Sequence, residues 1–241
     1  TFYRVIFPDA SIFDYCRDEE QLIENIRRLN PADVDGYRRL AKHARDIFDV
    51  GYTRLADQPF DTVASMLRVV PDMIRLKSYR SVYSLVSDYI SDERLRRAFS
   101  FEPLLVGGNP CTITSIYLLI HWLERKWGVH FAKGGTTQLI QAFSKLLQKK
   151  GVDIQCNSPV EELMVKGGKV NGVRLSTGRE IACDLVVSNS DPVRFYRDCV
   201  NPRHRSKHSD RSLNAKEQSM SLFVCYFGTK KTYPQLEHHT I

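Results

Sequence analysis

Four side chains within the first 121 residues are candidates for accepting a proton, and no spacing groups them into a catalytic pattern. The candidates are Arg68, Asp88, Asp92 and His121. His121 lies in an apolar segment, where a histidine is either a buried core residue or a catalytic one. Arg68, which precedes Pro71, is either a charge on a solvated helix or part of the lining of a substrate channel. We take these four as candidate catalytic residues.

Two kinds of site have no signature in this sequence. The motif G-x-G-x-x-G, whose backbone holds nucleotide phosphates, occurs nowhere in the chain, so we expect any phosphate loop to lie outside it. The cysteines show no C-x-x-C spacing, and several lie in apolar segments, where they resemble small buried hydrophobic residues. The sequence therefore predicts a reducing cytoplasm and no metal site. The six cysteines are Cys16, Cys111, Cys156, Cys183, Cys199 and Cys225.

Composition and chain ends indicate a folded internal piece of a larger enzyme. The 241 residues are 42% hydrophobic and 10% aromatic, which is ordinary for a globular protein and argues against disorder. No run of 18 apolar residues occurs, so we expect no membrane-spanning helix. The chain starts at Thr1 without a signal segment and stops at Ile241 without a closing element, which predicts truncation.

The net charge of +7 is concentrated in two clusters. A solvated loop is one interpretation of the larger cluster, and contact with anionic lipid head groups is the other. Nucleic acid is not expected as a partner, because neither cluster is interleaved with aromatic residues at base-stacking spacing. The larger cluster contains Arg203, Arg205, Lys207, Arg211 and Lys216, and the smaller contains Arg94, Arg96 and Arg97.

The first half of the chain predicts helices. Apolar residues spaced three and four apart predict one short helix around residues 22–26 and a longer one over 37–48, separated by Asn30-Pro31. A third helix is expected from Asp61, a fourth over residues 79–90, and a fifth capped by Asp92. Residues 112–127 predict a helix that is apolar around most of its circumference. Such a helix is a core helix, or it faces a hydrophobic substrate tunnel or a membrane.

In the second half of the chain, the pattern of apolar residues predicts one helix and then short strands. Gly134-Gly135 precede a helix that we expect Thr136 to cap and Gly151 to end. Strands are predicted at 152–156, 160–165 and 170–175, then at 181–187 as a strand buried on both faces, and at 219–226. Tight turns at residues 166–169 and 176–178 would join three of these strands into antiparallel hairpins.

This order of motifs resembles the flavin-dependent amine oxidase and carotenoid desaturase superfamily. The strings G-G-T-x-x-L from Gly134 and D-L-V-V-S-N-S-D-P from Asp184 are general to it. Strings from the helical half look specifically like the bacterial phytoene desaturases. They are R-S-V-Y-S (80–84), R-A-F-S-F (97–101), L-L-V-G-G-N-P (104–110), S-I-Y (115–117) and E-R-K-W-G-V (124–129). The string S-L-F-V-C-Y-F-G (221–228), near the C-terminal end, resembles the same enzymes.

The resemblance implies an α/β (α+β) fold: part of an FAD-binding Rossmann-like domain with antiparallel β-hairpin strands, plus an inserted helical lobe. Residues 1–16 would be a strand region of a substrate domain, 17–130 the helical membrane and substrate lobe, and 131–200 part of the FAD-binding domain. Residues 201–241 would return to the substrate-domain sheet. The cofactor residues implied are Gly134, Gly135, Thr136, Val160 and Ser188, with backbone near the flavin nucleotide.

The resemblance also implies a reaction. FAD would take hydride from phytoene and partly desaturated carotenes on the way to lycopene in carotenoid biosynthesis, since no amino-acid side chain accepts hydride. A quinone or oxygen would then take the electrons. A lipid-borne substrate implies a peripheral enzyme on the cytoplasmic face of an anionic membrane. The alternatives are a carotenoid isomerase, a diapophytoene desaturase, a retinol saturase, or a non-catalytic isoprenoid- or membrane-binding module.

Overall fold

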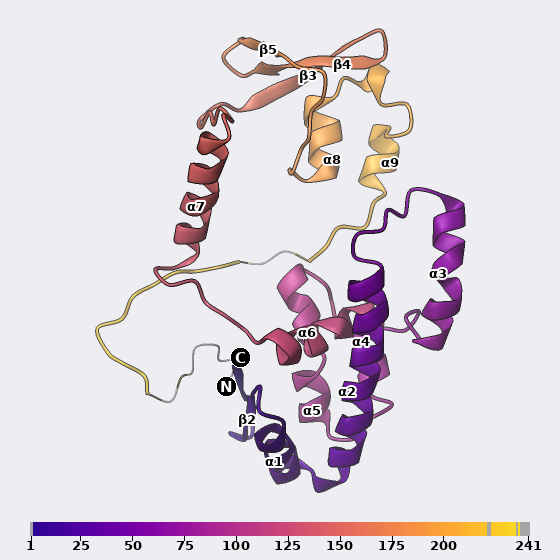
Figure 1. The fold of residues 1–241 in the computed structure, drawn as a ribbon, viewed down its shortest axis with the longest axis vertical. Coiled ribbons are helices and arrows are strands. Elements are labelled where there is room, and N and C mark those ends of the chain that lie inside the picture. The colour runs from indigo at the N-terminus through magenta and orange to yellow at the C-terminus, as the bar shows by residue number, and fades with distance from the viewer. Residues whose placement is uncertain (1, 221–222, 235, 237–241) are drawn as a thin grey trace. The chain divides into compact units, whose positions relative to one another are not determined.

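The computed structural model describes residues 2–220, 223–234 and 236. The chain forms two compact units (Figure 1). Unit 1 contains residues 1–130 and 219–241, and unit 2 contains residues 131–218. Each unit is described by itself. Helices and small antiparallel sheets make up the fold, as the α/β (α+β) prediction requires.

Unit 1 opens with an antiparallel hairpin of β1 (Tyr3–Ile6) and β2 (Ile12–Tyr15). Helix α1 (Glu19–Leu29) begins at Asp18, whose carboxylate accepts from the Gln21 amide at 2.8 Å. Asn30 ends α1, and a 3₁₀ turn, η1 (Pro31–Asp33), leads into α2 (Val34–Phe48). A π-helix, η2 (Asp49–Arg54), continues from α2. The two predicted helices and the break at Asn30-Pro31 are confirmed.

Helices α3 and α5 follow in unit 1. Helix α3 (Val63–Arg75) starts at a capping box of Thr62 and Ser65, close to the predicted start at Asp61. Helix α5 (Glu93–Ala98) is capped by Asp92 as expected. A 3₁₀ turn, η3 (Glu102–Val106), follows α5.

Two predicted helices are too long. Helix α4 covers Val82–Val86, not residues 79–90, because Ser81 caps it and pairs as an isolated bridge with Thr114. The predicted helix over 112–127 begins later, with a 3₁₀ turn η4 (Ser115–Leu118) and then α6 (Leu119–Trp127). Its start is delayed because the Ser115 amide donates to the Arg80 carbonyl at 2.7 Å.

The core of unit 1 lies between the hairpin and helices α1, α2, α4, α5 and α6, with α6 packed along α2 (Figure 1). The largest side chains with no exposed area come from the hairpin, from α2 and from the end of α5. Burial of this apolar area stabilises the unit at roughly 25 cal/mol per Å². These side chains include Phe13, Tyr15, Tyr37, Phe48 and Phe99.

Unit 2 contains α7 (Thr136–Lys149) and a three-stranded antiparallel sheet of β3 (Val160–Lys166), β4 (Lys169–Leu175) and β5 (Glu180–Ala182). The two predicted hairpins are confirmed. Short helical segments follow: α8 (Pro192–Arg194), the π-helix η5 (Phe195–Cys199), a 3₁₀ turn η6 (Pro202–His204) and α9 (Asp210–Asn214). The prediction that Thr136 caps α7 was wrong, because Gly135 occupies the N-cap position and Thr136 is the first helical residue.

Three predicted strands are wrong or incomplete. Residues 152–156 form no strand, and the apolar run after Ile181 leaves the sheet at Ala182. Leu185 and Val187 are 76% and 87% exposed, not buried on both faces. A buried strand needs hydrogen-bonded neighbours, and β5 pairs only with β4 among the described residues. The strand expected over 219–226 lies partly outside the described residues, and its described residues form none.

The expected burial of the cysteines is largely wrong. Cys16 is buried, Cys183 and Cys199 are partly exposed, and Cys111, Cys156 and Cys225 are exposed; all six are free thiols. The strand contexts that were expected to bury Cys156 and Cys183 do not form.

Within the described residues, no helix has the length and apolar character needed to cross a membrane.

Candidate functional site

The four candidate catalytic residues do not converge. Arg68 is an exposed residue of α3, and no ion pair joins it to another described residue. Asp88, beyond α4, accepts from Arg80 and from the Lys77 ammonium at 3.2 Å. These cations hold the pKa of the Asp88 carboxyl below its usual range, with Arg80 the larger cause. Asp88 therefore closes a surface turn as a carboxylate.

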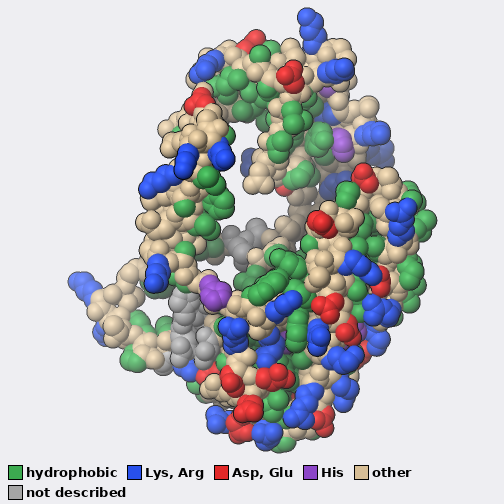
Figure 2. Space-filling view, viewed as in Figure 1, with side chains coloured by type: hydrophobic (Ala, Val, Ile, Leu, Met, Phe, Trp, Pro, Cys, Tyr) green, Lys and Arg blue, Asp and Glu red, His purple; other side chains and the backbone are tan. Residues whose placement is uncertain are grey.

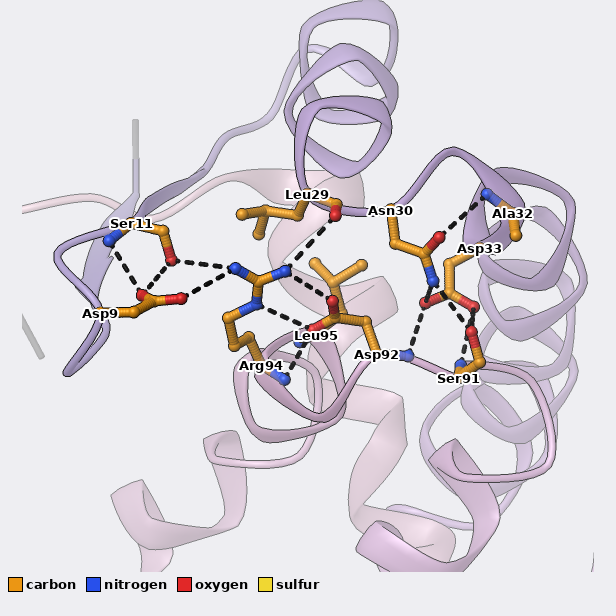
Figure 3. A network of polar contacts seen from close by, with 10 residues as sticks. All are labelled: Asp9, Ser11, Leu29, Asn30, Ala32, Asp33, Ser91, Asp92, Arg94 and Leu95. Atoms are coloured by element: carbon orange, nitrogen blue, oxygen red, sulfur yellow. Dashed lines mark hydrogen bonds and ion pairs between the residues drawn. The ribbon is translucent and has the colours of Figure 1, made fainter.

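Asp92 is part of a polar network that ties four segments of unit 1 together (Figure 3). Its carboxylate caps α5 by accepting from the Arg94 amide at 2.8 Å, and it also accepts from the Arg94 guanidinium at 2.7 Å. Hydrogen bonds from Arg94 lower the pKa of Asp92. Arg94 reaches on to Asp9 at 3.0 Å in the β1–β2 turn. The smaller basic cluster thus includes an arginine engaged in internal ion pairs.

Asp33 occupies the other half of this network (Figure 3) and is 2% exposed. Its carboxylate accepts from the amides of Ser91 and Asp92 at 2.7 and 2.8 Å, and from the Asn30 side chain at 2.9 Å. A buried carboxylate with this many donors is satisfied without a ligand. The arrangement positions the start of α5 against η1, and it leaves Asp92 in a structural role.

His121 lies in a buried polar cluster that sequence reasoning did not identify. Its side chain is fully buried, with Nδ1 2.6 Å from the Tyr15 hydroxyl oxygen. The same hydroxyl lies 3.3 Å from Oε1 of Glu102, which is also fully buried. Nearby, the Tyr3 hydroxyl donates to Glu124, one turn along α6 from His121. Two glutamates, a histidine and two tyrosines from distant segments therefore share one interior region.

Burial sets the protonation of this cluster. It raises the pKa of Glu102 to about 8 and that of Glu124 to about 8, and it lowers the pKa of His121 to about 3. All three groups are therefore uncharged near neutral pH. Within the described residues, Glu102 Oε2, Glu124 Oε2, His121 Nε2 and Tyr37 Oη have no hydrogen-bond partner. The cluster can store protons as neutral acids, but its buried atoms offer no direct contact to a substrate.

The signal for this cluster was present in the spacing of α6. His121 and Glu124 are three residues apart, so they share one face of an otherwise apolar helix. In the structure that polar face is the buried one, and the apolar side chains Leu119, Ile120 and Trp122 are only partly buried. The core-helix interpretation of residues 112–127 did not anticipate this inversion.

The cofactor candidates all belong to unit 2. Gly134 and Gly135 have φ angles of +80° and +86°, which favour glycine. A Cβ at Gly135 would meet no atom within 4 Å, so the backbone there is open to a ligand. The glycines lead into the N-terminus of α7, where the helix dipole favours an anionic group.

Val160 begins β3 and is 42% exposed, and its carbonyl lies 3.7 Å from the Cys199 thiol. Ser188 is exposed, with its hydroxyl 2.7 Å from that of Ser190. No hydrogen bond between described residues joins the three candidate segments. They fit a flavin nucleotide in that their backbone is accessible, with Gly134, Gly135 and Thr136 as the part suited to an anionic group. They supply only part of a cofactor site, since the phosphate motif is absent from the sequence.

Comparison with known proteins identifies the family of this chain. The sequence pattern of the family described as "Flavin containing amine oxidoreductase" matches residues 4–239. The chain is 43% identical over its full length to a lycopene-forming phytoene desaturase of Pantoea ananas and covers 49% of that protein. It is 44% identical to the lycopene-forming enzyme of Pseudescherichia vulneris, covering 49%, and 36% identical to a neurosporene-forming phytoene desaturase of Rhodobacter capsulatus, covering 47%. In each case all of this chain is aligned.

The chain spans about half the length of the curated relatives it matches. The family match supports the expected cofactor, FAD, and it covers both structural units. The helical half and the strand half thus both lie within one family match. The chain belongs to the family of flavin-containing amine oxidoreductases.

Proposed function

We propose that this chain is the central part of an FAD-dependent phytoene desaturase that acts in carotenoid biosynthesis and forms lycopene. One observation carries the proposal: identity of 42–44% to three lycopene-forming enzymes extends over all of this chain, the helical unit included. Identity to the neurosporene-forming relatives is lower, at 36%. A 4,4'-diapophytoene desaturase is 28% identical, which makes that alternative less favoured.

The chemistry divides between cofactor and protein. FAD, when bound, supplies the hydride acceptor that side chains lack. The chain's own part is to expose the Gly134-Gly135 backbone and the N-terminus of α7 to the cofactor, and to offer apolar surface to a hydrocarbon. Oxygen or a quinone is the proposed final electron acceptor. No general base is assigned, because Asp88 and Asp92 are held in ion pairs and His121 is fully buried.

Product analysis tests this function. Full-length, flavin-loaded enzyme is incubated with phytoene in liposomes, and the products are separated by chromatography. We expect products with more double bonds than phytoene, ending at lycopene. An unchanged double-bond count, with or without a changed geometry, would remove the desaturase assignment and leave the isomerase or the non-catalytic binding module.

We further propose that the enzyme is a peripheral protein on the cytoplasmic face of an anionic membrane. Helix α3 supports this location because Val63, Leu67 and Ile74 are 77%, 64% and 63% exposed and, at helical spacing, lie in one stripe on one face of the helix. Arg68 and Arg75 on the same helix are exposed. An amphipathic helix with apolar and basic faces suits an interface between water and lipid.

Flotation with anionic liposomes measures this association. Leu67→Glu places a charge in the α3 stripe and should lower the membrane-bound fraction of the full-length enzyme severalfold, because burying an ionised carboxylate in the lipid boundary is unfavourable. Ala64→Glu adds the same charge to an exposed position of the same helix outside the stripe and should have a smaller effect. Equal flotation of wild type and Leu67→Glu would contradict a role for this stripe.

A further inference from the structure

A cavity of about 190 Å³ lies between the end of α2 with η2 on one side and α3 on the other. Apolar side chains form nearly all of its wall, and they come from separate segments of unit 1. The π-helix η2 contributes Val50 and Gly51 to it. π-Helical turns are rare in proteins, and those that occur are often found at functional sites. Other lining residues include Ile47, Phe60, Val69 and Met73.

Two of the polar side chains at this cavity, those of Asp72 and Thr114, are bonded to the protein. Asp72 is the one charged residue in the lining, and it pairs with Arg54 of η2 and with Arg75 at 3.1 Å. The Thr114 hydroxyl donates to the Ser78 carbonyl. None of the unpartnered buried side-chain atoms found among the described residues belongs to the lining. Little polar surface faces the cavity, which therefore favours an apolar ligand.

Its volume limits what can enter. An apolar protein cavity of about 150 Å³ takes up benzene, which has six carbons. A cavity of about 190 Å³ therefore admits a branched group of about that size, such as one five-carbon isoprene unit, and not a whole polyisoprenoid chain. The remainder of a long hydrocarbon would leave through the open side of the cavity.

We infer that this cavity is a binding site for one terminal isoprene unit of a long polyisoprenoid hydrocarbon. The inference rests on the proposed function for the identity of the hydrocarbon. The ion pair between Arg54 and Asp72 joins η2 to α3, so it keeps the two walls of the cavity together. Holding one end of an otherwise featureless chain would fix the position of the hydrocarbon along its length within unit 1. This gives the helical unit a way to position a substrate that has no polar group.

Unit 1 offers a matched pair of variants for the full-length, flavin-loaded enzyme. Val69→Phe fills the cavity, whereas Val106→Phe makes the same change at an exposed position of η3 that does not line it. We expect Val69→Phe to raise the KM for phytoene tenfold or more with a smaller change in kcat, since even one methylene in an apolar pocket is worth about tenfold. Val106→Phe should match the wild type. Equal effects of the two variants, or no effect of either, would overturn the assignment.

Two further measurements separate the possible failures. Flavin content and thermal midpoint are recorded for each variant, and Val69→Leu serves as a milder filling variant if Val69→Phe does not fold. Crystals of the enzyme under xenon test the cavity without catalysis, because xenon enters dry apolar cavities. Xenon between η2 and α3 in the wild type and its loss in the filling variant support the site. An enzyme that binds xenon there but does not convert phytoene would refute the proposed function only, and a cavity that excludes xenon would refute this inference only.

Discussion

The two units of this chain differ in how completely they bury their own apolar residues. Unit 1 encloses a core of side chains from the hairpin and five helices, many with no exposed area. Unit 2 has few buried residues, and α7 has none, although its apolar residues form a regular stripe visible along one side of the helix (Figure 2). The stripe consists of Leu139, Ile140, Phe143, Leu146 and Leu147, which are 43–64% exposed.

The difference shows that sequence periodicity predicts which face of a helix is to be buried, but not what buries it. In unit 1 the segments that cover the apolar faces of the helices lie within the described residues. In unit 2 the described residues supply the hairpins and α7 but no neighbouring strands for the apolar run 183–187. Because the curated relatives are about twice as long as this chain, we expect residues of the full-length protein to cover these apolar side chains.

The largest expected effect comes from removing a core ring of unit 1. Phe99 is fully buried, and its ring stacks on that of Tyr37 with 5.2 Å between the ring centroids. It also contacts the ring of Phe13 edge-on, with 5.6 Å between the centroids. Phe99→Ala should lower the free energy of unfolding of unit 1 by about 3–5 kcal/mol, because it leaves a cavity. Both tryptophans of the chain, Trp122 and Trp127, lie in unit 1, so urea unfolding followed by tryptophan fluorescence reports on that unit.

The matched control is Phe143→Ala on α7, where the ring is 57% exposed. In this chain, with the unfolding of both units followed by far-UV circular dichroism, we expect a change within about 0.5 kcal/mol, as for other exposed substitutions. In the full-length enzyme, where we expect the α7 stripe to be covered, the same substitution should cost more. A loss below about 1 kcal/mol for Phe99→Ala would contradict the contrast between the units.

A smaller effect is expected from the buried acids of unit 1, and it depends on pH. Glu102 has a pKa of about 8 in the folded chain against 4.5 ordinarily, so the folded state holds a proton that the unfolded state releases between these values. Stability supplied by this group is therefore complete below about pH 4.5 and is lost as the pH rises through 8. The raised pKa of Glu124 likewise makes the stability fall as the pH rises. The lowered pKa of His121 makes the stability rise with pH, but only below about pH 6.5.

Glu102→Gln keeps the shape and the neutral form of this side chain. The variant should match the wild type near pH 5 and be more stable by on the order of 1–3 kcal/mol at pH 9, so its stability falls less steeply between pH 6.5 and 8. Thermal midpoints across this range measure the slope. Glu217→Gln, at an exposed position of unit 2, should leave the slope unchanged. Parallel curves for Glu102→Gln and the wild type would show that Glu102 ionises normally.

Local signals predicted much of the fold. The break at Asn30-Pro31, the cap at Asp92 and the two hairpins after Val160 follow from neighbouring residues alone, and the structure confirms them. Errors arose where distant contacts decide the outcome. The start of α6 is set by a bond from Ser115 to Arg80, which no local pattern reveals.

The candidate site was less predictable for the same reason. His121, Glu102 and Tyr15 come together only through tertiary packing, and the wall of the α2–α3 cavity comes from residues up to about 70 positions apart, such as Ile47 and Ile116. The larger basic cluster also divides on folding. Arg205 is 5% exposed and bonds Asp210 at 2.6 Å, while Arg203 is exposed. Residue type and spacing could not separate these two arginines.

The most direct test of the proposed function is a single turnover in the absence of oxygen and quinone. Full-length enzyme with oxidised FAD is mixed with phytoene in liposomes, and the flavin absorbance and the carotene products are followed together. We predict that the yellow absorbance bleaches as phytoene gains a double bond, one flavin reduced per double bond formed. Flavin that stays oxidised while phytoene is bound, or bleaching without a new double bond, would contradict the proposal that this chain is part of a phytoene desaturase.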